Sequence, residues 1–372
     1  MKFICDRALL LNAVTIASRT VAVKSTIPAL EGLLFETGTD ELTITGYNLK
    51  TGVRTKVGAE ILEEGRLVLN AKLLGDIVRK LPDGEITVVA EDSLLVRLTC
   101  AVSYFEIMGS SPEDFPELPS VEAQTAFRIP ENKLRDMIAQ TLFAVSTNES
   151  RPVHTGSLFE IENNVLTMVS VDGFRLALRR EKLGEETEKT ESFVVPGAAL
   201  TEVGKIASDS EEMVIISLGA RHIMFSIEDT EVISRRLEGE FLDYRKSLPK
   251  EHKYSLLADR RELLNVFERV GLIISEKYKS HVRCRFDDGV LHISSATALG
   301  KATDECAYEG DGEGLVIGFN NRYVLDALRA APGDALRLQL SSAVAPCVLA
   351  PADDGDDSFV YLILPVRIPN EP

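Results

Sequence analysis

The amino-acid sequence predicts an α+β protein made of three repeated domains, each with two helices backed by antiparallel sheets. Three observations support this prediction. Three different sequence phrases recur in the same order, each phrase has the periodicity of a helix or of a hairpin, and the chain of 372 residues is too long for one hydrophobic core. A hydrophobic fraction of 45% with a charged fraction of 27% is typical of a folded globular protein.

The first phrase predicts a helix near the start of each repeat. It reads DRALLLNAV from Asp6, FRIPENKLRDMIAQTLF from Phe127 and DRRELLNVF from Asp259. The copies share one apolar position, which is occupied by Leu10, Leu134 and Leu263.

The first copy would also fit a short signal peptide. Because Asp6 interrupts that pattern and a twin of the phrase lies deep inside the chain, we expect a helix of a mature cytoplasmic protein.

The second phrase predicts a β-hairpin. Apolar and polar residues alternate around a Gly, Asn or Asp cluster, which is the pattern of two short strands joined by a tight turn. The three copies are GLLFETGTDELTIT (Gly32 to Thr45), GSLFEIENNVLTMV (Gly156 to Val169) and a weaker VRCRFDDGVLHISS (Val282 to Ser295).

The third phrase predicts a short strand that leads into a second helix. Its copies are LVLNAKLLGDIVRKLPDG from Leu67, VVPGAALTEVGKIASDS from Val194 and LVIGFNNRYVLDALRAAPGD from Leu315. In each helix an acidic residue precedes a basic residue by three positions, a spacing that favours an ion pair on the helix surface. These pairs are Asp76 with Arg79, Glu202 with Lys205, and Asp326 with Arg329.

The order of the phrases divides the chain into three units. Chance similarity of helical patterns would explain a single phrase, but not three phrases that recur in one order at nearly one period. Proline-bearing joints, SSPEDFPELPS and FLDYRKSLPK, fall where the copies meet. We therefore predict domains at residues 1–120, 121–248 and 249–372.

The charge is distributed unevenly. The net charge is −17, yet the six helical stretches carry a net positive charge and the rest of the chain is strongly acidic. A shared basic helical face would attract phosphates while the outer surface repels other polyanions. Six helices in a circle would leave a hole only about 7 Å wide, and twelve about 24 Å, whereas a DNA duplex is wider than about 16 Å. Two chains could enclose DNA and one could not; the alternative is that these residues are ordinary solvated helix faces.

Other functional classes find little support. The five cysteines are scattered and predict free buried thiols in a reducing compartment. No apolar run approaches the roughly 20 residues of a membrane span. TALGKAT, from Thr297 to Thr303, lacks the upstream glycine and the hydroxyl of a phosphate-binding loop, and no metal or hydrolase motif occurs. We expect no catalytic residues, no cofactor and no metal; a repeat-built scaffold that binds only proteins remains an alternative.

Several segments resemble one protein family. MKFICDRALL, FETGTDELTITGYNL, DFPELP, VSVDGFRLAL, GEFLDYRKSLPK, ISEKYKSHVR, GFNNRYVLDAL and YLILPVRI are similar, in order and along the whole chain, to the bacterial DNA polymerase III β subunits, the sliding clamps. The resemblance implies the DNA-clamp fold in a ring-shaped, head-to-tail homodimer of six domains, with twelve helices around a central hole. It implies a non-catalytic processivity factor that encircles double-stranded DNA without sequence preference.

The resemblance also implies residues that approach DNA. Lys24 is expected on an inner loop near the duplex, and the further candidates are Arg7, Arg79, Lys133, Arg135, Lys205 and Lys277. Where the family often has basic residues, this chain has Gly197 and Ala198. The middle domain is therefore expected to hold DNA more weakly.

A further implication is an apolar groove between the second and third units for short linear peptides of the polymerase III α subunit, the clamp loader, other polymerases and repair proteins. The residues that match it are His154, Thr155, Val171, Gly173, Phe174, Arg175, Leu176, Leu242, Lys246, Asn320, Tyr323, Val344, Leu362, Leu364, Pro365, Val366 and Arg367. Phe174 stands where histidine or tyrosine is expected, and Leu242 where proline is expected. Burial in a final strand is the alternative for YLILP, and residues 369–372 extend beyond the usual end.

The dimer seam is expected between the first unit of one chain and the third unit of the other. By resemblance it contains Tyr104, Phe105, Ile107, Leu272 and Ile273. Core packing within one subunit is the competing explanation for each of these apolar residues.

Overall fold

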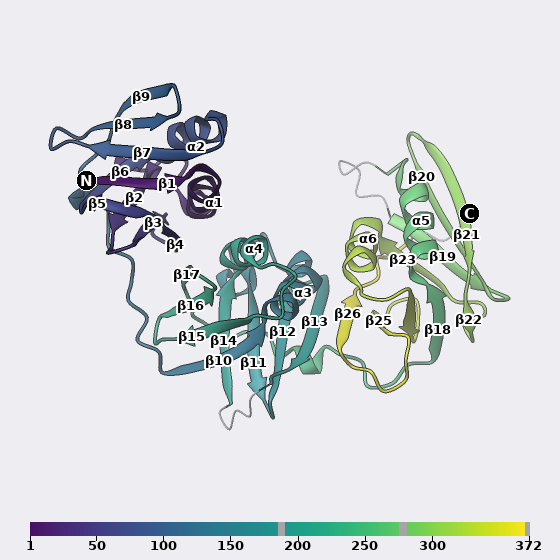
Figure 1. The fold of residues 1–372 in the computed structure, drawn as a ribbon. Helices are drawn as coiled ribbons and strands as arrows, with labels where there is room; N and C mark the ends of the chain where they lie inside the picture. The colour runs from purple at the N-terminus through teal and green to yellow at the C-terminus, as the bar shows by residue number, and fades with distance from the viewer. Residues whose placement is uncertain (185–189, 275–280, 369–372) are drawn as a thin grey trace. The chain divides into compact units, whose positions relative to one another are not determined.

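The computed structural model describes residues 1–184, 190–274 and 281–368, and Figure 1 shows the fold. It is an α+β protein with antiparallel sheets, as the sequence predicts. Six α-helices lie in the described residues, and each coincides with a predicted stretch. They are α1 (Arg7–Ala17), α2 (Ala71–Lys80), α3 (Glu131–Thr141), α4 (Gly197–Ile206), α5 (Arg260–Gly271) and α6 (Asn321–Ala330). Because α1 ends at Ala17, Lys24 lies on a loop and not on the helix.

The chain divides into two compact units, and the first comprises Met1–Arg135 with Ala198–Arg236. It contains a five-stranded sheet in the order β5-β1-β7-β8-β9. Its strands are β1 (Lys2–Asp6), β5 (Glu60–Glu63), β7 (Glu85–Ala90), β8 (Leu95–Cys100) and β9 (Ser103–Met108). An eight-stranded sheet follows the order β10-β15-β16-β17-β4-β3-β2-β6. Its strands are β2 (Gly32–Thr37), β3 (Glu41–Tyr47), β4 (Thr51–Gly58), β6 (Arg66–Asn70), β10 (Thr125–Pro130), β15 (Met213–Leu218), β16 (His222–Ile227) and β17 (Thr230–Arg235).

The second unit comprises Asp136–Gly197 with Leu237–Pro372. Its nine-stranded sheet has the order β14-β11-β12-β13-β26-β25-β24-β18-β22. The strands are β11 (Gly156–Glu162), β12 (Val165–Val171), β13 (Arg175–Lys182), β14 (Glu191–Pro196), β18 (Tyr254–Asp259), β22 (Glu309–Gly310), β24 (Ala335–Leu340), β25 (Cys347–Pro351) and β26 (Phe359–Ile363). A four-stranded sheet has the order β21-β20-β19-β23. Its strands are β19 (His281–Asp287), β20 (Val290–Thr297), β21 (Gly300–Ala307) and β23 (Val316–Asn320).

The two compact units do not follow the predicted repeats, because two sheets continue from one repeat into the next. Strand β17 pairs with β4 in the first unit, and β13 pairs with β26 in the second. The predicted boundaries after residues 120 and 248 therefore stay a prediction.

The three predicted hairpins are present as β2–β3, β11–β12 and β19–β20. In the second hairpin Asn163 and Asn164 form the turn with φ of 51° and 62°. In the third, Asp288 and Gly289 have φ of 46° and 76°. Asn, Asp and Gly adopt these left-handed conformations at low cost, which explains the clusters seen in the sequence.

Equivalent helices of different repeats begin with the same kind of capping hydrogen bond. Asp6 accepts bonds from the amides of Ala8 and Leu9 at the start of α1, and Asp259 accepts from Glu262 at the start of α5. Asn70 and Asn320 cap α2 and α6 in the same way. Such caps satisfy amides that have no partner inside the helix.

The predicted charge pairs are confirmed in two of the three repeats. Asp76 lies 3.0 Å from Arg79, and Glu202 lies 2.9 Å from Lys205. The third prediction is wrong. Asp326 instead binds Arg175 at 2.6 Å, and Arg329 binds Glu268 at 2.7 Å.

The cores lie between the helices and the sheets, with α1 packed on α2 and α5 packed on α6. The shared leucines Leu10, Leu134 and Leu263 are buried in the three repeats. All five cysteines are free and buried, as predicted. Burial raises the pKa of Cys5 and Cys306 to about 11 and that of Cys347 to about 12, so these thiols stay protonated and poorly reactive at neutral pH. In the part of the chain that the structure describes, no helix has the length and apolarity needed to cross a membrane.

Candidate functional site

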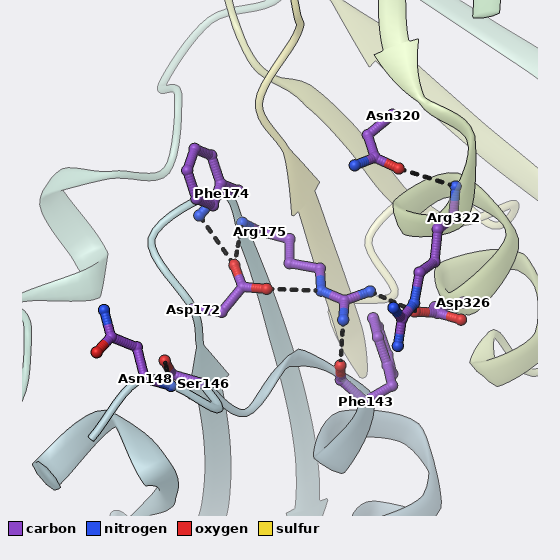
Figure 2. A network of polar contacts seen from close by, with 9 residues as sticks. All are labelled: Phe143, Ser146, Asn148, Asp172, Phe174, Arg175, Asn320, Arg322 and Asp326. Carbon is purple, nitrogen blue, oxygen red and sulfur yellow. Dashed lines mark hydrogen bonds and ion pairs between the residues drawn. The ribbon is translucent and has the colours of Figure 1, made fainter. Parts of the chain in front are cut away.

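The best-defined polar network of the second unit surrounds Arg175 at the start of β13 (Figure 2). Its Nε donates to Asp172 at 3.0 Å, its Nη1 donates to Asp326 at 2.6 Å, and its Nη2 donates to the carbonyl of Phe143 at 2.6 Å. The side chain is only 8% exposed. One guanidinium therefore joins the β12–β13 turn, the segment after α3, and α6.

Two aromatic rings cover the same guanidinium. Its carbon lies 4.5 Å from the ring centre of Tyr323 and 5.4 Å from that of Phe143. Phe174 in turn stacks on Tyr323, with ring centres 6.2 Å apart and planes at 25°. Arg175 was predicted as a peptide contact, yet it donates three hydrogen bonds within the protein and lies against two of the protein's own aromatic rings.

Strand pairing brings some of the predicted groove residues together from two repeats. Leu176 on β13 is the cross-strand partner of Leu362 on β26, and both are buried. They belong with Val171 to one apolar cluster. The alternative that YLILP is a buried final strand is thus correct for Leu362. Beyond β26, the amide of Leu364 donates to the carbonyl of Phe174 at 2.9 Å.

Several other predicted residues reach solvent. Phe174 is 60% exposed, Leu364 is 37% exposed, and Leu242 and Val344 are also exposed. Large exposed apolar side chains mark candidate interaction surfaces. The other predicted members on loops or helix ends are Thr155, Gly173, Lys246, Asn320, Pro365, Val366 and Arg367.

His154 is held within the second unit. Its ring packs edge-on against Phe241 with centres 5.4 Å apart. Burial lowers the pKa of His154, and the nearby Arg151 lowers it further. The imidazole is therefore neutral at pH 7, so the structure favours an apolar wall at this position over a charged one.

Six of the seven predicted DNA-facing residues fall into three groups. Lys24 and Lys133 are exposed. Arg79 and Lys205 form ion pairs on their own helices, and Arg135 binds Asp209 at 2.8 Å. Lys277 lies outside the described residues. The Asp76–Arg79 pair is exposed on both sides and therefore weak, so Arg79 can exchange its partner for a phosphate, whereas the pairs of Lys205 and Arg135 each include one partly buried side chain.

Arg7 has a structural role that the sequence did not suggest. Its Nε donates to the carbonyl of Val78 at 3.2 Å and its Nη2 donates to that of Arg79 at 2.9 Å, at the end of α2. Arg260, at the same position of α5, donates to the carbonyls of Leu328 and Gly333 near the end of α6. Arg7 thus caps the end of a helix, and its assignment as a DNA contact stays a prediction.

The predicted seam residues lie at two exposed places. Tyr104, Phe105 and Ile107 are on β9, the edge strand of the five-stranded sheet. Leu272 and Ile273 follow α5, and Leu272 is exposed. The competing explanation of core packing fits Ile107, which is partly buried against the core of the first unit, but not Tyr104, Phe105 or Leu272, because each of these is exposed in the chain.

Family models match the chain in three consecutive pieces. They describe the N-terminal domain of the DNA polymerase III beta subunit at residues 1–119, its central domain at 128–243 and its C-terminal domain at 245–367. This chain belongs to the DNA polymerase III beta subunit family. The family is that of the beta sliding clamps, so the resemblance stated from the sequence is confirmed.

Related beta sliding clamps are similar to this chain over nearly its full length. The beta sliding clamp of Halalkalibacterium halodurans is 33% identical over 99% of this chain and 100% of its own. The beta sliding clamp of Staphylococcus aureus strain Mu50 is 30% identical over 99% of both chains.

Solved structures of sliding clamps share the fold. The DNA polymerase sliding clamp of Bacillus subtilis has a TM-score of 0.94 at 29% identity and covers 99% of both chains. The sliding clamp of Pseudomonas aeruginosa bound to griselimycin has a TM-score of 0.93 at 27% identity and covers 99% of this chain and 100% of its own. The DNA-clamp fold predicted for this chain is therefore confirmed.

The sequence missed the residues that hold the clamp's candidate peptide surface together. Asp172, Asp326 and Phe143 all bind Arg175. Asp326 was assigned to a helix-surface pair, because spacing within one helix is visible in a sequence and contacts between repeats are not. The only available signal was the Asp172-Gly173 turn, which directly precedes Arg175.

Proposed function

We propose that this clamp protein encircles duplex DNA as a ring and tethers the replicative polymerase for processive synthesis. The observation that carries the proposal is the ordered match of all three clamp domains along one chain with the fold of solved clamps. The protein is a non-catalytic subunit. A scaffold that binds only proteins is not favoured, because the family is that of DNA polymerase clamps.

The way the repeats join within the chain supports a head-to-tail homodimer. The last strand of repeat two, β17, pairs with β4 of repeat one, and the last strand of repeat three, β26, pairs with β13 of repeat two. Strand β9 is the corresponding strand of repeat one, and β21 corresponds to β4 and β13. Both are edge strands of their sheets. The same rule predicts that β9 pairs with β21 of a second copy.

The two seams within the chain also predict the register of this pairing. Val232 pairs with Val53 in one seam, and Tyr361 pairs with Ala177 in the other. Phe105 occupies in repeat one the position that Val232 and Tyr361 occupy in repeats two and three. Ala302 occupies in repeat three the position that Val53 and Ala177 occupy in repeats one and two. The equivalent pair across the proposed seam is therefore Phe105 with Ala302 of the second copy. Val232 and Tyr361 are fully buried, whereas Phe105 is 37% exposed. This difference is expected if a strand of a second copy covers Phe105 in the dimer, as β4 and β13 cover Val232 and Tyr361 within the chain.

The neighbouring pair allows a direct test of the dimer. The register places Tyr104 opposite Thr303 on the solvent face, where cross-strand Cβ atoms lie about 5 Å apart. A Tyr104→Cys, Thr303→Cys variant should form a disulfide-linked dimer under mild oxidation, and a denaturing gel measures it at twice 40.8 kDa. The five native cysteines are buried and should not interfere.

A matched control shifts one partner by a single residue. In a Tyr104→Cys, Ala302→Cys variant the two thiols point to opposite faces of the sheet and should stay unlinked. Equal linking in both variants would contradict the register, and a monomer mass in solution would contradict the ring.

DNA contact in the proposed ring is electrostatic. Lys24, Lys133, Arg135, Arg79 and Lys205 would attract phosphates without reading bases, which lets the ring slide. The acidic remainder of the chain repels other polyanions. Lys277 remains a candidate.

We place the domain boundaries after residues 120 and 248, close to the limits of the matched family models.

The proposed peptide surface is the exposed apolar set Phe174, Leu242, Val344 and Leu364 above the buried Leu176 and Leu362. Its partners would be the polymerase III α subunit, the clamp loader and other polymerases and repair proteins. Apolar anchors of a short peptide gain most where they displace water from such a surface.

Removing one wall of this surface should weaken peptide binding. Leu364→Ala should lower the affinity for a synthetic peptide from the α subunit about tenfold, because one well-packed apolar anchor contributes an energy of this order. Calorimetry measures the affinity. Leu62→Ala, an exposed leucine on β5, is the matched control and should bind normally. Normal binding by Leu364→Ala would mean that the peptide lies elsewhere.

A further inference from the structure

One position recurs in the sheets of all three repeats. Its cross-strand pairs are Leu34 with Val68, Leu158 with Val194, and Arg283 with Gly318. After the last strand of each repeat the chain returns to this position. It does so in the isolated bridges of Val68 with Ser110, Val194 with Leu237, and Gly318 with Val366. Leu34, Leu158 and Arg283 are therefore equivalent residues.

In the first two repeats a later segment of the chain covers this position. Leu34 lies in one apolar cluster with Phe115, which is buried after β9. Leu158 lies in another apolar cluster with Tyr244, which is buried after β17. Both segments lead from the last strand of one repeat toward the first strand of the next. The fold thus shows twice that this face of the sheet can hold a connecting polypeptide segment.

In the third repeat the equivalent face is polar and open. Cys284 and Ile293 are buried in the core beside Phe267 of α5, so their strand neighbours point to the opposite face, here called the open face. Its two cross-strand rows are Arg283, Ser294 and Thr303, and Arg285, His292 and Glu305. In the described part of the chain the open face carries a hollow of about 620 Å³, lined by β19, β20 and β21 alone. This volume is in the range of ligand-binding clefts.

Arginine side chains give the open face its chemistry. Arg283 shares its row with two hydroxyl groups and with no acid. In the second row Glu305 is engaged with His292 at 3.1 Å. Arg285 is 53% exposed, and its pair with Asp287 at 3.5 Å is weak because both side chains are about half exposed. Guanidinium groups bind carboxylates strongly through two parallel hydrogen bonds. Both arginines therefore suit the carboxylates of a ligand.

The other acid that lines the hollow is bound from the α5 side of the sheet. Asp304 lies 2.5 Å from Arg269, and the hydrogen bond from this guanidinium lowers the pKa of Asp304. Its negative charge is therefore matched within the protein and opposes an acidic ligand little.

We propose that the open face of the third repeat is a second protein-docking surface, which takes an extended acidic segment of a partner protein across Arg283 and Arg285. The segment would cover the sheet as the connecting segments cover the equivalent faces of the first two repeats. The open face shares no residue with the proposed peptide surface around Phe174 and Leu364. The inference therefore goes beyond the proposed function and does not depend on peptide binding there.

A polypeptide fits the open face better than a single-stranded nucleic acid does, although phosphates would also be attracted to the arginines. Sites for single strands stack the bases on aromatic side chains. Among the described residues, no phenylalanine or tyrosine lines the hollow. The segments on the two equivalent faces are also polypeptide.

The test uses the full-length protein and a fluorescein-labelled peptide of alternating glutamate and alanine, with fluorescence anisotropy as the measurement. An Arg283→Gln, Arg285→Gln variant should bind the peptide about tenfold more weakly, because it loses two exposed charge contacts. An Arg54→Gln, Arg66→Gln variant is the matched control. It removes two partly exposed arginines of the eight-stranded sheet and should bind normally.

Two further measurements do not depend on the loss of binding. An Arg283→Glu, Arg285→Glu variant should prefer a lysine–alanine peptide to the glutamate–alanine peptide. A photoreactive form of the acidic peptide should crosslink to β19, β20 or β21 of the wild-type protein, as mapped by mass spectrometry.

Four results would overturn the inference. Wild-type protein might show no affinity for the acidic peptide, the glutamine variant might bind it as well as wild type does, or the crosslinks might fall outside β19, β20 and β21. In the fourth, a short oligothymidylate binds more tightly than the peptide and loses affinity in the glutamine variant, which would make the open face a nucleic-acid site. None of these results bears on peptide binding at Leu364.

Discussion

Linearising a circular duplex should release the loaded protein, whereas the intact nicked circle should retain it. A closed ring leaves DNA only over an end or by opening, so retention depends on topology and not on contact strength. We expect the half-life on the circle to exceed that on the linear form by roughly a hundredfold or more at one salt concentration, because free electrostatic contacts dissociate rapidly. Gel filtration of labelled protein before and after a single restriction cut measures the difference.

Two controls separate enclosure from affinity. Higher salt weakens phosphate attraction and should speed sliding, yet it should leave retention on the circle largely unchanged. If the Tyr104→Cys, Thr303→Cys variant is oxidised after loading, it should stay on the circle even in denaturant. Equal loss from circle and linear DNA would remove the enclosing role.

The fold could be predicted because residues close together in the sequence determine the structure of each repeat. Hairpin turns at Asn163 and Asn164, caps at Asp6 and Asp259, and one buried leucine per first helix all depend on residues close in sequence. The same residue patterns therefore predict the same turn, cap or buried position in each repeat. Agreement among three copies made each prediction firmer than a single segment allows.

The candidate site was harder to predict, because its decisive contacts cross from one repeat to the next. Arg175 looked like a surface contact, but Asp326 and Phe143 bury it. Arg7 is predicted as a DNA contact, and the sequence does not reveal that it also binds the carbonyls at the end of α2. A residue type and its spacing indicate which partners it could bind, and tertiary packing decides which it does bind.

Replacing Arg175 by methionine should destabilise the seam between β13 and β26. The variant keeps most of the side-chain volume and removes the Arg175 cation from Asp172 and Asp326, both mostly buried, although Arg322 still lies 3.9 Å from Asp326. Removing one partner from such a pair costs on the order of 3 kcal/mol. Hydrogen exchange of the amides in β13 and β26 measures the local opening free energy, which should fall by about this amount.

Arg245→Met provides the matched comparison in the same unit. Arg245 also binds a carboxylate through two nitrogens, with distances of 3.1 and 3.0 Å to Glu160, but its side chain is 56% exposed. Water screens this pair, so its loss should cost no more than about 1 kcal/mol. If the two variants lost similar amounts, burial would not be what makes the Arg175 network strong. In that case peptide binding by Arg175→Met should also be normal, since Phe174 and Tyr323 would keep their positions without the guanidinium.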